Sequence, residues 1–137
     1  MDNFDYVDYI LRYDKLYSSN VVFYKDSFKS SDGLIRPIVM TGDTHMIEGC
    51  LGEAILENKE DGVVAKCRFN ETDRGKAVKD IFATTDEYGI SVYANGIQYD
   101  NLGYPVNVKK VKSAHVRAVI VVHKAGLIKV VGDYAEE

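Results

Sequence analysis

The chain has 137 residues, 46% of them hydrophobic and 28% charged, and its formal net charge is -4. Such a composition is typical of one soluble globular domain, here residues 1–137 with a polar tail from Asp133, and it excludes a disordered chain. The acidic balance argues against a nucleic-acid partner, because phosphate binding requires clustered Lys and Arg. No apolar run approaches the roughly 20 residues that span a bilayer, so no membrane partner is expected.

The first half of the chain predicts short strands separated by polar turns. Tyr-rich and β-branched segments favour strands, and Pro37 restricts one of them to a sheet edge or end. One turn of helix is expected over 24–29, before the breaker Ser30-Ser31-Asp32-Gly33. The expected strands are residues 5–13, 20–23, 34–40, 49–56 and 63–69.

The second half begins with the clearest helix. Thr72 is a suitable N-cap, and the apolar residues that follow at helical spacing are Ala77, Val78, Ile81 and Phe82. A strand over 87–94 should end at Asn95-Gly96, a strong hairpin-turn signal. The most apolar stretch then predicts a central β-hairpin, whose strands 116–122 and 127–131 are joined by residues 123–126.

These elements predict an α+β, β-dominated fold with a single domain. An open sheet leaves unpaired backbone groups along its two edge strands, and closing the sheet into a barrel pairs them. We therefore expect a closed or partly closed β-barrel of about six to seven mostly antiparallel strands. One main helix and one or two minor helices should flank the barrel.

Three polar residues stand out against this apolar background: His45 after a turn, Ser91 in a Gly-x-Ser strand, and His115 at the mouth of the expected hairpin. The nucleophile-elbow pattern G-x-S-x-G is absent, because Tyr93 occupies its last position. A serine can nevertheless be activated by a histidine base whose tautomer is held by a third group, and that group need not be a carboxylate.

The order of these residues resembles the capsid-maturation serine proteases. The segment H-V-R-A-V-I-V-V-H-K-A-G-L-I-K-V-V-G is similar to the final block of the herpesvirus assemblins, and R-P-I-V-M-T-G-D-T-H-M-I-E-G-C-L-G to their general-base block. The stretch from Cys67 to Ala94 resembles the tailed-phage prohead proteases, in which strand, helix and a G-x-S strand follow one another. The resemblance covers Ile35 to Gly132.

This resemblance implies an assemblin-like serine endopeptidase without a cofactor or metal. Its nucleophile would be Ser91, its general base His45 and its orienting third member His115. The backbone N–H of His123 would form the oxyanion hole, with Lys124 as a charged helper.

The resemblance also implies substrates, a location and an assembly state. The substrates would be scaffolding protein and the removable segment of the major capsid protein, cleaved inside an immature viral capsid in the host cytoplasm. A homodimer is a further possibility that the assemblins suggest.

Several other interpretations remain open at this point. Asp100 is the nearest acidic substitute for the third triad member. Zinc on His45, His115 and His123 is disfavoured because these residues have no short ligand spacing, and a thiol protease using Cys50 is disfavoured because nothing evident would lower its pKa. A catalytically inactive assemblin-like capsid component, or a small barrel with a purely binding role, remain the alternatives to a protease.

Overall fold

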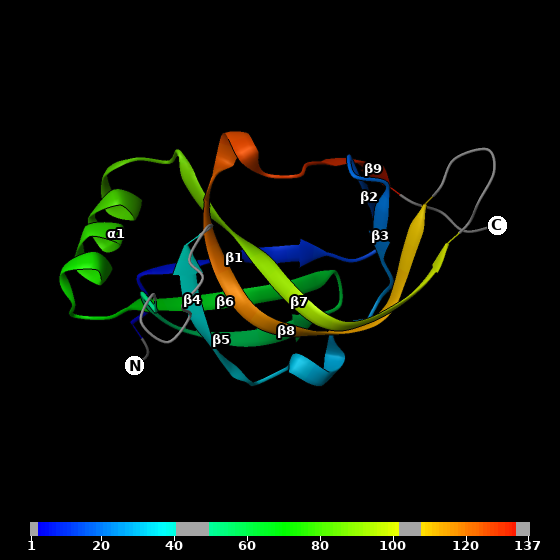
Figure 1. Ribbon diagram of the computed structural model, residues 1–137, viewed down its shortest axis with the longest axis horizontal. Helices are drawn as coiled ribbons and strands as arrows, with labels where there is room; N and C mark the ends of the chain where they lie inside the picture. Colours follow the sequence, from blue (N-terminus) through cyan, green and yellow to red (C-terminus); the bar gives the residue numbers. More distant parts are fainter. Residues whose placement is uncertain (1–2, 41–49, 102–107, 134–137) are drawn as a thin grey trace.

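The computed structural model describes residues 3–40, 50–101 and 108–133. Every strand in these ranges joins one sheet, which curls into a half-barrel flanked by one α-helix (Figure 1). The helices are η1 (Lys29–Ser31), α1 (Asp73–Thr84) and η2 (Lys124–Gly126). The strands are β1 (Tyr6–Arg12), β2 (Lys15–Tyr17), β3 (Val21–Phe23), β4 (Ile35–Met40), β5 (Gly52–Lys59), β6 (Gly62–Phe69), β7 (Tyr88–Asn101), β8 (Lys109–His123) and β9 (Val130–Asp133).

The strands follow the order β1-β6-β5-β4-β8-β3-β2-β9, and β7 pairs with β8. Most pairs are antiparallel, but β4 and β3 both run parallel to β8, at different points along it. The β-dominated prediction is therefore confirmed, together with expected strands such as those at 5–13 and 63–69, which correspond to β1 and β6.

The apolar stretch predicted to lie in the middle of the fold does so as β8, but it forms no hairpin with the chain that follows. Strand β9 pairs with β2 instead. The reason is that both edges of β8 are already occupied, one by β7 and the other by β4 and β3. The predicted hairpin of 116–122 with 127–131 is therefore wrong.

The predicted turn at Asn95-Gly96 is also wrong. Strand β7 continues through these residues to Asn101 and pairs with β8 along its length, with register shifts near Asn95. Gly96 has a φ of +61°, a conformation that glycine adopts at little steric cost, so the irregularity is absorbed without a chain reversal. The turn signal therefore marks a distortion in a long strand.

Of the closed or partly closed barrel that we expected, the described residues form a half-barrel, in which the curled sheet encloses the core. Strand β1 approaches β7, but the two strands do not pair within the described chain, so a closed barrel is not formed there. The core is one cluster of large side chains from the sheet and from the segments next to it, with almost no exposed surface: Phe28, Ile38, Leu51, Leu56, Val63, Val116 and Val119.

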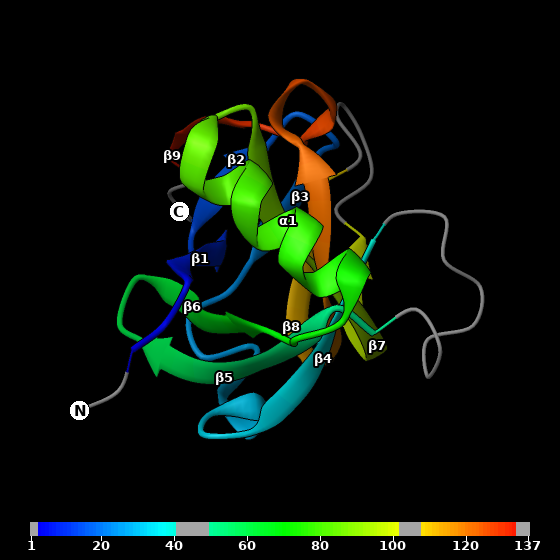
Figure 2. The ribbon, with the colours of Figure 1, turned by 90° about the vertical axis from the view of Figure 1, so that its left-hand side faces the viewer.

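Helix α1 lies across one end of the half-barrel, as Figure 2 shows with the helix facing the viewer. Val78 is buried, and the Phe82 ring stacks on Phe69 of β6 at 5.4 Å and contacts Tyr6 of β1 at 4.4 Å between ring centroids. Ala77, which we expected on the apolar stripe, is exposed. The helix packs through the larger members of the stripe because aromatic side chains bury more apolar area than alanine.

Removing the N-cap of α1 is expected to destabilise the protein modestly. The Thr72 side chain accepts a hydrogen bond from the backbone N–H of Gly75 at 3.1 Å, which satisfies a donor that the first helical turn would leave unpaired. Thr72→Ala should lower the free energy of unfolding by about 1 kcal/mol. Urea denaturation would measure this change, and Thr72→Ser, which keeps the hydroxyl, should stay near wild type; equal losses in both variants would contradict the capping role.

Candidate functional site

Ser91 lies on β7 at a half-buried position and pairs with Ile120 of β8. It lines an apolar cavity of about 230 Å³ between β7, the N-terminal strands and the chain that follows η2. The lining residues are Ile10, Tyr17, Ser19, Val21, Phe23, Ser91, Val92, Leu127 and Ile128. Apart from Ser19 and Ser91, this lining is apolar or aromatic, and small-molecule and side-chain pockets commonly combine an apolar wall with a few polar groups.

His45, the predicted general base, lies outside the described residues. The strand that leads toward it is described: Val39 of β4 pairs with Ile120 of β8, the same residue that Ser91 faces from the other side. Strands in a sheet lie about 4.8 Å apart, so β4 and β7 are roughly 10 Å apart at this point. The topology therefore brings the last residues of β4, including Met40, across one strand from Ser91.

His115 is not brought to Ser91. It pairs with Asn95, four residues along β7 from Ser91, which corresponds to about 13 Å. At this backbone separation the Ser91 and His115 side chains do not contact each other directly. In addition, His115 Nδ1 lies 2.6 Å from the Oγ of Ser30. Among the described residues, the His115 ring therefore has its hydrogen-bond partner at Ser30 and no direct contact with Ser91.

The positions of β8 nearest to Ser91 carry no polar replacement for His115. Side chains that flank Ile120 on the same face belong to Ala118 and Val122, which pair with Tyr93 and Gly89. Asp100, the acidic alternative, lies at the far end of β7, where its carboxylate forms an ion pair with Lys112 at 2.9 Å. Neither the β8 residues beside Ile120 nor Asp100 therefore places a polar side chain directly at Ser91.

The predicted oxyanion residues lie on the other side of Ser91. His123 pairs with Tyr88, three residues before Ser91, at roughly 10 Å along the strand. The His123 ring packs edge-on against Tyr88, and its Nδ1 accepts a hydrogen bond from the Ala125 N–H. The Lys124 N–H donates to the Glu87 carbonyl. Each of these groups serves the structure of η2, and neither is placed beside Ser91.

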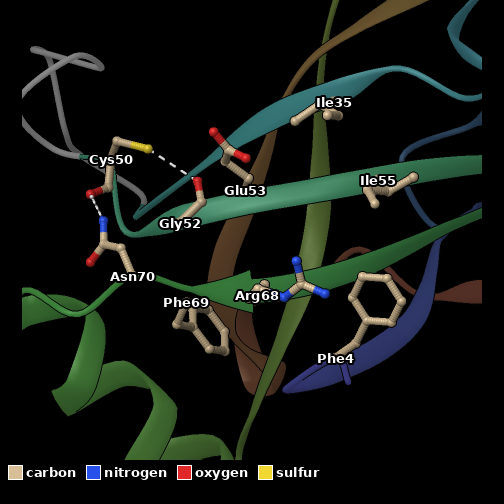
Figure 3. Close-up of a pocket in the computed structure, with 9 residues that line it drawn as sticks. All are labelled: Phe4, Ile35, Cys50, Gly52, Glu53, Ile55, Arg68, Phe69 and Asn70. Carbon is tan, nitrogen blue, oxygen red and sulfur yellow. Dashed lines mark hydrogen bonds between the residues drawn. The ribbon is translucent and has the colours of Figure 1, made fainter. Parts of the chain in front are cut away.

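Another cavity, of about 330 Å³, lies on the outer face of β5 and β6 (Figure 3). Cys50 lines it, with Sγ donating to the Gly52 carbonyl, and the Asn70 amide donates to the Cys50 carbonyl. None of the predicted serine or histidine residues is among its lining residues. The second cysteine, Cys67, is fully buried, and burial raises the pKa of its thiol to about 12, so it stays protonated at neutral pH.

Sequence reasoning missed the partner of His115. Ser30 was assigned to a breaker segment, and nothing in its local sequence indicates a contact with a residue 85 positions away. Arg36 and Arg117, which share a cavity with His115, were also missed, because they are separated by most of the chain and meet only through the pairing of β4 with β8.

The residues that the structure describes offer neither a metal site nor a membrane-spanning helix. No group of three metal-ligating side chains lies close enough there to hold an ion. No helix among these residues is long and apolar enough to cross a membrane. Comparisons with protein-family models, with curated proteins and with solved structures find no match to this chain.

Proposed function

We propose that this chain is a capsid-maturation serine endopeptidase that uses Ser91 as nucleophile and His45 as general base, without His115 in the catalytic group. One observation carries the proposal: Ser91 lines an apolar cavity and faces Ile120, the residue that also pairs with β4, the strand leading toward His45. The resemblance to assemblins and prohead proteases supplies the reaction class.

In this proposal, Ser91 Oγ attacks the carbonyl carbon of the scissile peptide while the His45 imidazole removes the hydroxyl proton. The same imidazole then donates that proton to the departing amine. The cavity lined by Val21, Val92 and Leu127 accepts an apolar side chain of the substrate. The substrates are scaffolding protein and capsid-protein segments inside an immature viral capsid in the host cytoplasm. The active form is a homodimer, as the likeness to assemblins suggests.

A second candidate is an inactive assemblin-like component that binds scaffold or capsid protein. The observation that favours it is the apolar character of Ala118 and Val122, which leaves β8 with no side chain beside Ser91 to orient a histidine base. A catalytic serine and histidine without an orienting group would be slower than a full triad, because the base would not be held in the correct tautomer.

Labelling with a fluorophosphonate probe separates the two candidates. We expect the wild type to be labelled, Ser91→Ala to lose labelling completely, and His45→Ala to be labelled much more slowly. His115→Ala and Ser30→Ala are the controls, and both should still label, since neither side chain lies at Ser91. The reaction should be followed over a range of protein concentrations, in case a dimer is required.

The contrary outcomes are distinct. Absence of labelling at every concentration would favour the inactive component. Labelling that persists in Ser91→Ala but disappears in Ser30→Ala would move the nucleophile to Ser30. Loss of labelling in His115→Ala, with the fold intact by circular dichroism, would restore the Ser-His-His arrangement that the sequence predicts.

A further inference from the structure

A third cavity, of about 320 Å³, lies where β4 meets β8 and has a basic lining. It is lined by Arg36, Pro37, Asn95, His115, Val116 and Arg117. Two arginines and a histidine therefore line one hollow, and no acidic residue is among the lining residues. This cavity is separate from the one that Ser91 lines, because the two share no residue.

Arg36 is held in place by the backbone around it. Its Nε donates to the Val116 carbonyl at 2.8 Å, and its Nη1 donates to the carbonyl of Ile35 at 3.0 Å. A guanidinium has five N–H donors, so these two bonds orient the group and leave further donors for a ligand. An arginine anchored in this way loses little rotamer entropy when it binds an oxyanion.

Arg117 reaches the cavity through a β-bulge. Tyr93 of β7 pairs with Ala118 and the next residue, Ala94, pairs with Val116, so Arg117 is the extra residue on β8. Bulges change the direction of a side chain relative to a regular ladder and are enriched next to functional sites. The exposed Arg117 side chain is thus placed at a point where the sheet is locally irregular.

His115 is oriented by Ser30, whose Oγ lies 2.6 Å from Nδ1. When the serine hydroxyl donates to Nδ1, the proton of the neutral ring is on Nε2, which can then donate to an anion. Asn95, the register partner of His115, adds an amide to the same lining. The cavity therefore combines charged and neutral hydrogen-bond donors.

Positive charges gathered in this way repel one another unless a counter-charge is present. Within the described ranges, none of the ion pairs involves Arg36 or Arg117. We propose that this cavity binds a phosphate group, with Arg36 and Arg117 as charged donors and His115 as a third contact. A phosphate dianion matches two guanidinium groups better in charge than a single carboxylate does.

The proposal is tested by titrating the protein with inorganic phosphate at constant ionic strength. The chemical shifts of the backbone amides in NMR spectra report the binding. We expect saturable shifts centred on Asn95, His115 and Arg117. Arg117→Gln should weaken binding by about tenfold, because a charge-assisted hydrogen bond is lost. Arg68→Gln is the matched control: it removes the same charge from an exposed arginine on β6 that stacks on Phe4, outside this cavity, and binding should not change.

Arg36→Gln should also weaken phosphate binding, and its thermal melting curve would report whether the fold is retained. A parallel titration with acetate distinguishes the anion: much weaker saturation by acetate is expected for a phosphate site, whereas equal or tighter binding of acetate would overturn the preference for phosphate. Shifts that do not saturate, or equal weakening by Arg117→Gln and Arg68→Gln, would overturn the site itself. None of these readouts depends on peptidase activity.

Discussion

Replacing Phe28 with alanine is expected to lower the free energy of unfolding by about 3–5 kcal/mol. The ring has no exposed surface and packs edge-on against Phe23, with 5.5 Å between ring centroids. Alanine would remove these contacts and leave a cavity that the surrounding sheet can fill only partly. The backbone near Phe28 is also held by β8, because the Ala114 N–H donates to the Ser27 carbonyl and the Val116 N–H donates to Ser31 Oγ.

Chemical denaturation monitored by circular dichroism would measure this loss. Tyr93→Ala is the control, since that aromatic ring is 48% exposed, and its cost should be less than about 1 kcal/mol. A loss in Phe28→Ala no larger than in Tyr93→Ala would contradict the core position. Because η1 follows directly on Phe28, the same variant should also loosen the contact between Ser30 and His115, visible as a changed His115 ring signal in NMR spectra.

Alanine at position 52 is expected to cost about 3 kcal/mol through overpacking. Gly52 lies between two strands, where it pairs with Phe69 of β6 and Ile38 of β4. An added Cβ would lie 2.1 Å from the Arg68 carbonyl oxygen and 2.8 Å from the Phe69 Cα, and both are backbone atoms. The ladder would have to separate locally to admit the methyl group, because backbone atoms cannot rotate away as a side chain can.

Gly132→Ala provides the comparison, because a Cβ at that position meets nothing within 4 Å. Its unfolding midpoint should stay close to wild type, whereas that of Gly52→Ala should fall clearly. Equal midpoints for the two variants would show that β5 and β6 do not approach as closely at Gly52 as the structure places them. Since Cys50 and Gly52 also line the cavity of Figure 3, Gly52→Ala should reduce the space available there.

Two of the predicted catalytic residues line different cavities beside β7 and β8. Ser91 lines the apolar cavity, while His115 belongs to the basic one with Arg36 and Arg117. If both proposals hold, a peptide would be cleaved at one end of this strand pair while an anion is bound at the other. Fluorophosphonate labelling and phosphate titration report on the two sites separately.

Local sequence signals predicted the elements that depend mainly on local interactions. Thr72 caps α1 as expected, since an N-cap needs only the next few residues, and Val78 and Phe82 form its packing face. The strand at 63–69 was predicted from its alternating apolar residues. Such alternation arises whenever one face of a strand is buried, because successive side chains point to opposite faces of the sheet. Asn95-Gly96 was misleading because pairing with β8 along a long strand outweighed the turn preference of two residues.

By itself, the sequence determined a β-dominated domain, the helix that begins after Thr72 and the central position of the apolar segment ending at His123. Periodicity, capping and burial of apolar area decide these features, and all three are encoded over short stretches. Only the tertiary structure decided that β9 pairs with β2, that His115 meets Ser30, and that Arg36 and Arg117 share one cavity. These three contacts depend on strand order and register. Order and register are set when segments distant in sequence compete for the same sheet edges, and the local sequence pattern contains no information about that competition.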